Sequence, residues 1–172
     1  SFPTRRSSDL ASFSSRGTLV DGRLKPDITS VGVGVFSTIE NNSYIIMQGT
    51  SMAAPGVTGT VALLYERFMQ LNNALKPDAS LIKGIVCNTA DDLGNIGPDY
   101  IYGYGKINGL RAVRVIEQGN YYSNSISQSG VQTQNITIPA GTGQLKVTLC
   151  WTDREAIANA NPAIVNNLDL SV

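Results

Sequence analysis

A serine suited to nucleophilic chemistry lies in the stretch GTSMAAPGVTG, residues 49–59. Ser51 follows closely on Gly49, which gives the backbone freedom for a strand-to-helix turn, and Ala53 and Ala54 leave room for a second chain to approach. A hydroxyl at the start of a helix has free N–H donors and a partial positive charge beside it, and both stabilise an oxyanion. Serine is also a favoured N-cap residue, so these residues predict either a nucleophile or a helix cap.

A serine hydroxyl becomes a strong nucleophile only when a base takes its proton, and that base is oriented by a carboxylate. The 172 residues contain no histidine. We therefore expect this chain by itself to be catalytically inert, because it lacks the imidazole of a Ser-His-Asp triad.

Residue patterns indicate the elements that would position Ser51. Residues 35–38 and 43–48 are β-branched and aromatic runs, which predict short strands joined by a turn at Asn41–Asn42. A further short strand is expected at 26–29. A helix is predicted over 51–71, with a buried first half of small residues and an exposed second half. Its apolar residues recur at helical spacing: Val57, Val61, Leu64, Phe68 and Leu71.

Two more helices and a change of character follow. One helix is predicted in DASLIKGIVCNTA, with Asp78 or Ser80 as its cap, and another in KINGLRAVRVIEQG, with Asn108 as N-cap and Gly119 as terminator. After Gly119 a polar stretch reads as a linker. The segments NITIP and QLKVTLCW then alternate apolar and polar residues, which is typical of strands with one buried face.

The stretch GTSMAAPG resembles the nucleophile motif of the subtilisin-like serine proteases, the subtilases. FSSRG, DGRLKPDI, VFST and YGYGKIN also fall where the catalytic domain of that family has similar motifs. The later text LKVTLCWTD…AIVNNLDL resembles the β-sandwich domain attached to some bacterial subtilases. The resemblance implies an α/β fold, namely the C-terminal part of a subtilisin-like domain with a mostly parallel sheet, followed by a truncated antiparallel β-sandwich.

The resemblance also implies roles for individual residues. Ser51 matches the nucleophile, and its backbone N–H would donate one hydrogen bond to the oxyanion. Gly49 and Thr50 would line the catalytic cleft and contact substrate. Met52 matches a methionine beside the leaving-group pocket, which implies sensitivity to oxidation. Gly56 stands where many relatives have a histidine that is not the triad base.

The expected domain organisation has four parts. Residues 1–10, SFPTRRSSDL, resemble a translated sequencing adapter and are expected to be an artefact, with a short disordered basic tail as the alternative. Residues 11–118 are assigned to a partial subtilase catalytic domain, 119–132 to a linker and 133–172 to the truncated β-sandwich. In subtilases the aspartate and histidine precede the serine, so the resemblance places them upstream of residue 11.

Composition limits the partners and cofactors. The sequence has 13 lysine and arginine residues and 13 aspartate and glutamate residues, so it lacks the excess of positive charge that would indicate nucleic acid as a partner. No apolar run approaches the length of about 18 residues that a membrane span needs. No metal ligands are identified and no cofactor is expected. The family allows a structural calcium ion, but Asn167 stands where the sandwich motif often has aspartate. Cys87 and Cys150 favour two buried free thiols over a disulfide.

The resemblance implies a secreted or cell-envelope, monomeric serine endopeptidase acting on polypeptides through a seryl acyl-enzyme, present here as an incomplete fragment. One alternative is a sedolisin-type serine-carboxyl protease, whose base is a glutamate. A second is an S-x-x-K acyl-transfer serine, because Ser80 and Lys83 fit that spacing. A third is an inactive pseudoprotease or a binding module.

Overall fold

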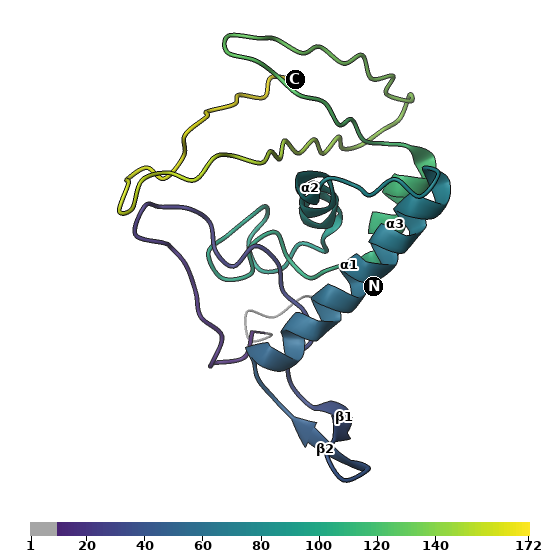
Figure 1. Ribbon diagram of the computed structural model, residues 1–172, viewed down its shortest axis with the longest axis vertical. Helices are drawn as coiled ribbons and strands as arrows, with labels where there is room; N and C mark the ends of the chain where they lie inside the picture. The colour runs from purple at the N-terminus through teal and green to yellow at the C-terminus, as the bar shows by residue number, and fades with distance from the viewer. Residues whose placement is uncertain (1–9) are drawn as a thin grey trace.

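The computed structural model describes residues 10–172; residues 1–9, which hold most of the expected artefact, lie outside the described part. Figure 1 shows the long helix α1 running diagonally and a hairpin projecting beyond its first turn. The C-terminal loops lie at the opposite end of the molecule from the hairpin, above α2 in this view. No helix of the described part is both long and apolar enough to cross a membrane. The elements are β1 (Val35–Ile39), β2 (Ser43–Met47), α1 (Thr50–Leu71), α2 (Ala79–Thr89) and α3 (Gly109–Gln118).

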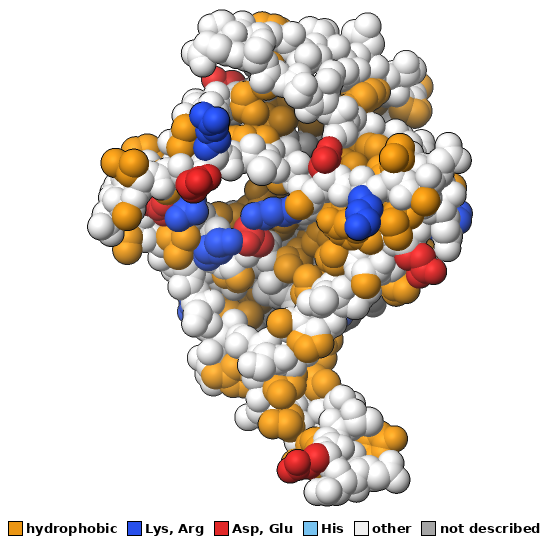
Figure 2. Space-filling view, in the orientation of Figure 1, with side chains coloured by type: hydrophobic (Ala, Val, Ile, Leu, Met, Phe, Trp, Pro, Cys, Tyr) orange, Lys and Arg blue, Asp and Glu red, His pale blue; other side chains and the backbone are white. Residues whose placement is uncertain are grey.

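Strands β1 and β2 form an antiparallel hairpin, as the sequence predicts. Val35 pairs with Met47 and Ile39 with Ser43. The loop between them contains Asn41 and Asn42, both with positive φ, a conformation that asparagine tolerates better than most residues. The side chains of both strands are largely exposed, and hydrophobic patches lie among polar and backbone atoms on the projecting hairpin (Figure 2).

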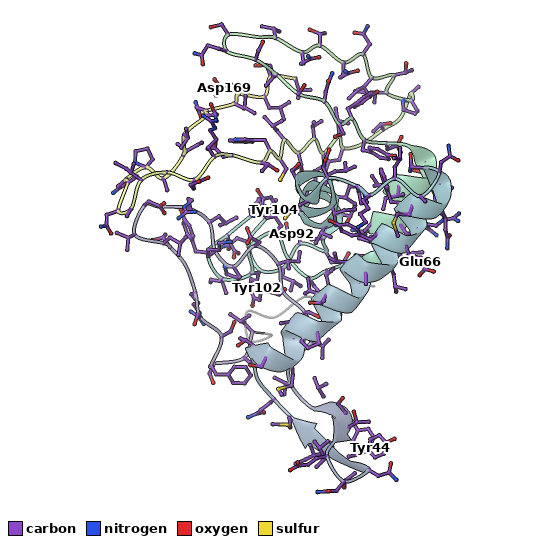
Figure 3. All side chains as sticks on the ribbon, in the orientation of Figure 1. Tyr44, Glu66, Asp92, Tyr102, Tyr104 and Asp169 are labelled. Atoms are coloured by element: carbon purple, nitrogen blue, oxygen red, sulfur yellow. The ribbon has the colours of Figure 1, made fainter. Side chains whose placement is uncertain are left out.

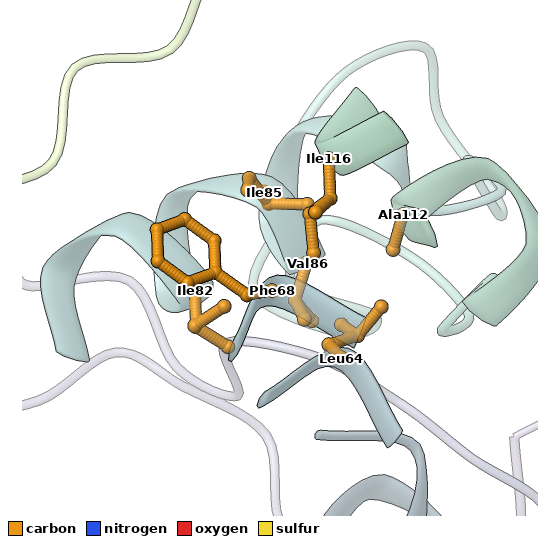
Figure 4. Close-up of a cluster of buried hydrophobic side chains, with 7 residues drawn as sticks. All are labelled: Leu64, Phe68, Ile82, Ile85, Val86, Ala112 and Ile116. Atoms are coloured by element: carbon orange, nitrogen blue, oxygen red, sulfur yellow. The ribbon is translucent and has the colours of Figure 1, made fainter. Parts of the chain in front are cut away.

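The core lies where the second half of α1 meets α2 and α3 (Figure 4). This reverses the prediction for α1, because the buried residues of the helix are in its second half and its small-residue first half is exposed or half-buried. The apolar faces of α2 and α3 pack on the second half, whereas small side chains offer little apolar area to bury. The buried cluster comprises Leu64, Phe68, Ile82, Ile85, Val86, Ala112 and Ile116.

The structure confirms Asp78 as the residue that precedes α2, and Asn108 and Gly119 as the two ends of α3. Asp78 occupies the N-cap position of α2, although its side chain accepts a hydrogen bond from Ser123 Oγ (2.8 Å) and none from the helix. Asn108 caps α3 by accepting a hydrogen bond from the backbone N–H of Arg111 (3.0 Å). Gly119 ends α3 with φ 66°, in the left-handed conformation that glycine adopts most readily.

The expected mostly parallel sheet is not formed by the described residues. The one sheet of these residues is the antiparallel hairpin, and parallel pairing is limited to a single bridge between Thr29 and Lys106. Lys106 also bridges Asp91 in antiparallel sense, so the strand expected at 26–29 is reduced to one paired residue. A strand requires a hydrogen-bonded ladder with a neighbour, and these segments supply only isolated pairs.

The expected β-sandwich is also not formed within residues 120–172. NITIP and QLKVTLCW contain no strand, and backbone hydrogen bonds within this region are limited to turns such as Gly130 N–H to Ser127 O (2.9 Å). Their alternating pattern indicates extended chain, but extended chain becomes a strand only when another segment pairs with it. The division at residues 119, 132 and 133 therefore stays a prediction.

Both cysteines are free thiols, as expected, with Cys87 buried and Cys150 half-buried. Burial, reinforced by the Asp27 carboxylate, raises the pKa of Cys87 from 9.0 to about 11. Burial also raises the pKa of Cys150 above its ordinary value. Since only the thiolate is strongly nucleophilic, both thiols are poorly reactive at neutral pH.

We expect Cys87 to be alkylated by iodoacetamide about 100-fold more slowly in the folded chain than in the urea-unfolded chain at about pH 8. The rate should climb as pH rises toward about 11, because the thiolate fraction grows. The raised pKa means that the folded state favours the protonated thiol of Cys87. This preference contributes fully to the free energy of unfolding below about pH 9, and the contribution is lost as pH rises through about 11. Mass spectrometry of the Cys87 peptide measures the rate; equal folded and unfolded rates would contradict the expectation.

Candidate functional site

Ser51 is the second residue of α1, at the joint between the hairpin and the helix. The N-cap position is occupied by Gly49, so the interpretation of Ser51 as a helix cap is wrong. Ser51 is exposed, and its hydroxyl makes no hydrogen bond to any residue in the described part of the chain. Its hydroxyl is therefore free for a base or a substrate.

Gly49 fixes the entry into α1. Its φ of 152° lies in the range that strongly favours glycine. The Gly49 N–H donates to the carbonyl oxygen of Gly32 (2.8 Å), and the Gly49 carbonyl accepts from the N–H groups of Met52 (3.0 Å) and Ala53 (3.3 Å). The turn that carries Ser51 is thus anchored to the preceding loop on one side and to the first helical turn on the other.

The backbone N–H groups of Thr50 and Ser51 make no hydrogen bond within the described part of the chain. The first N–H groups of a helix have no partner inside it, and the 22-residue α1 places a partial positive charge at this end. No acidic residue lies in the first turn. The helix start is therefore suited to stabilising an anion beside Ser51.

The small residues of α1 make room for the chain's own loop. A Cβ on Gly32 would lie 2.7 Å from the Gly49 carbonyl oxygen and 3.1 Å from Ala53 Cβ, while a Cβ on Gly56 would lie 2.9 Å from Ser30 Oγ. Residues 30–32 thus cross directly over the first turns of the helix. The sequence predicted space for a second chain at Ala53, but it did not identify Gly32 as the residue that uses this space.

Two motifs far apart in sequence hold that loop in place. The DGRLKPDI and YGYGKIN motifs lie side by side, and the N–H of Tyr104 donates to the carbonyl of Asp27 (2.9 Å). Gly103 has φ 63°, and a Cβ there would overlap the carbonyl oxygen of Pro26. This close approach explains the glycine and fixes the chain just before residues 30–32, which in turn contact the start of α1.

The remaining predicted site residues cluster around the same turn. Thr50 is exposed and Met52 is half-buried, with its sulfur 3.5 Å from the position of a Cβ on Gly49. Two concavities in the described part, one lined by residues of 19–23 and 153–163 and one between α1 and α3, include none of residues 49–52. Among residues 10–172 no group of three or more acidic or cysteine side chains is arranged to hold a metal ion.

Comparison with known proteins gives a match to the subtilase family over residues 3–105, more than half of the chain. This match includes part of the stretch assigned to an artefact, and that assignment stays a prediction. The minor extracellular protease Vpr of Bacillus subtilis (strain 168) is 34% identical over an alignment of 145 positions, which covers 74% of this chain and 17% of that protein. The C5a peptidase of Streptococcus pyogenes is 42% identical over 66 residues, 38% of this chain and 6% of that protein.

Among solved structures, the CspB protease of Clostridium perfringens matches with a TM-score of 0.59 and 30% identity over 67% of this chain and 25% of that one. The chain therefore spans a quarter or less of the length of each of these relatives. The matched residues include the helix start with Ser51, the DGRLKPDI motif and the first four residues of YGYGKIN. The chain belongs to the subtilase family of serine proteases.

Proposed function

We propose that this chain is part of a serine endopeptidase in which Ser51 attacks the peptide carbonyl and forms a seryl acyl-enzyme. The observation that carries the proposal is the free hydroxyl of Ser51 at the start of α1, beside unpaired N–H groups, in a chain of the subtilase family. The sequence contains no histidine, so the triad base and its orienting aspartate would come from residues outside this sequence.

In the proposed reaction, a histidine base takes the Ser51 proton as Oγ attacks the carbonyl carbon. The backbone N–H of Ser51 then donates to the developing oxyanion, helped by the positive end of α1. Gly49 and Thr50 line the cleft, and Met52 lies beside the leaving group. The fixed turn at Gly49 supports this assignment, because nucleophile and oxyanion donor must be held in one geometry.

The complete protein is proposed to be a secreted or cell-envelope monomer that cleaves polypeptides without a required cofactor. The name of the Bacillus relative, which describes an extracellular protease, supports the location. We also infer that the complete catalytic domain has a mostly parallel sheet, to which the Thr29–Lys106 bridge would belong, and that residues 133–172 begin an antiparallel β-sandwich. The alternating pattern of NITIP and QLKVTLCW supports the sandwich.

A fluorophosphonate probe tests the proposal, since it reacts with serine hydroxyls that a base has activated. In a longer protein that includes the aspartate and histidine, the probe should label Ser51, as located by peptide mapping, and Ser51→Ala should abolish labelling. The chain of 172 residues alone should stay unlabelled. Labelling of Ser80 would instead favour the S-x-x-K alternative, with Lys83 as its base. Labelling of Ser51 in the isolated chain would favour a base other than histidine, such as the carboxylate of a sedolisin-type enzyme.

A further inference from the structure

Two cysteines from distant parts of the sequence lie at one face of α2: Cys87 belongs to this helix, and Cys150 packs against it. Cys87 lies on this helix, three residues after Gly84. A Cβ on Gly84 would lie 3.2 Å from Cys150 Cβ, so Cys150 packs directly against the helix surface. Residues three apart on a helix are neighbours on its surface, with Cβ atoms about 5–6 Å apart. We propose that Cys87 and Cys150 are a redox modification site, a dithiol that closes to an intramolecular disulfide when the protein meets an oxidising thiol–disulfide pool.

Hydrogen bonds hold the segment that carries Cys150 along α2. Asn88 Nδ2 donates to the carbonyl oxygen of Lys146 (3.1 Å) and to Oγ1 of Thr148 (2.9 Å). Lys146 Nζ in turn donates to the carbonyl oxygen of Cys87 (3.5 Å). Residues 146–150 therefore run antiparallel to the helix, with Lys146 beside its last turn and Cys150 one turn earlier. These three hydrogen bonds, made by Lys146 and Thr148, hold the segment that carries Cys150 against α2 without using the Cys150 thiol.

Charged groups surround the two thiols. Lys83, on the same helix, forms an ion pair with Asp27 (Nζ–Oδ1 3.3 Å), and Tyr104 lies beside α2 in Figure 3. The positive charge of Lys83 opposes the burial that raises the pKa of both thiols. The Asp27 carboxylate acts in the opposite direction: it has the larger effect on the pKa of Cys87, whereas Lys83 has the larger effect on the pKa of Cys150. Because Cys150 is half-buried and Cys87 is buried, Cys150 is the thiol that an external disulfide reaches first.

The reaction is thiol–disulfide exchange with a low-molecular-weight disulfide as the oxidant. The Cys150 thiolate attacks the external disulfide, forms a mixed disulfide and releases one external thiolate. The Cys87 thiol then loses its proton to solvent, and its thiolate attacks the Cys150 sulfur and releases the second external thiolate. Two protein thiols are oxidised and one external disulfide is reduced to two thiols, which take up the two protons that the protein thiols lose. The new bond joins α2 covalently to residues 146–150.

The test is to equilibrate the chain in buffers of reduced and oxidised glutathione, quench with acid and map the unreduced peptides. We expect a cross-linked peptide pair containing Cys87 and Cys150, about 2 Da lighter than the sum of the reduced peptides, at a yield independent of protein concentration. The effective concentration of the thiol pair should be at least about tenfold higher in native buffer than in urea, because the fold pre-positions Cys150. Glutathione adducts without the cross-link, cross-links only between chains, or equal effective concentrations would overturn the proposal.

Variants separate a positioned pair from chance proximity. Cys87→Ser should leave a stable glutathione adduct on Cys150, whereas Cys150→Ser should leave Cys87 largely reduced because it is buried. Asn88→Ala removes two hydrogen bonds to the 146–150 segment and should lower the effective concentration about tenfold. Asn124→Ala removes the hydrogen bond of an exposed asparagine to Gln132, which lies outside the 146–150 segment, and should leave the effective concentration unchanged. Equal values for both asparagine variants would also overturn the proposal. None of these outcomes depends on the proposed protease activity.

Discussion

In a longer protein that contains the triad aspartate and histidine, Ser51→Ala is expected to lower kcat by about 10⁴ to 10⁶-fold, with KM changed by less than about threefold. The variant removes the atom that would form the acyl-enzyme. It keeps the Gly49 turn and the backbone N–H that would hold the oxyanion. The loss should therefore appear in the chemical step rather than in substrate binding, and steady-state hydrolysis of a fluorogenic peptide measures both constants.

Ser80→Ala is the matched control, because Ser80 is the second residue of α2 just as Ser51 is the second residue of α1. It also tests the S-x-x-K alternative directly. Lys83, the lysine of that motif, forms an ion pair with Asp27, which gives it a structural role. We expect kcat of the Ser80 variant to stay within about twofold of the parent. A Ser51 variant that kept more than about one per cent of the parent activity, or a Ser80 variant that lost it, would refute the assignment of the nucleophile.

Leu64→Ala is expected to lower the free energy of unfolding by about 2–5 kcal/mol. Leu64 is only 1% exposed and belongs to the cluster formed by α1, α2 and α3. Truncating it removes buried apolar area, and the surrounding helices can close the resulting cavity only in part. Urea unfolding followed by far-UV circular dichroism measures the change at constant protein concentration.

The adjacent residue provides the control for this prediction. Leu63 has the same side chain one position earlier in α1 but is 66% exposed. Leu63→Ala should change the free energy of unfolding by less than about 0.5 kcal/mol, since alanine also favours helix. If the two variants were destabilised equally, the face of α1 that carries Leu64 would not be the face buried against α2 and α3.

The sequence alone determined the features that depend on a few neighbouring residues. The hairpin around Asn41–Asn42, the three helices, the Asn108 cap and the Gly119 terminator are all set by local backbone preferences and hydrogen bonds. The motif around Ser51 is local in the same sense. Its residues specify a glycine turn and a helix start, and this made the family recognisable from the sequence.

Only the tertiary structure decided which surfaces are covered and which segments pair. Helical spacing gives the apolar stripe of α1 but not which half of it meets α2 and α3, because those partners come from later in the chain. Alternation in QLKVTLCW indicates extended chain, yet residues 146–150 contact a helix instead of a strand. The contact of Gly32 with the turn before Ser51 likewise joins separate segments. Local preferences act over about four residues along the chain, whereas burial and strand pairing are determined by partners that only the folded chain brings together.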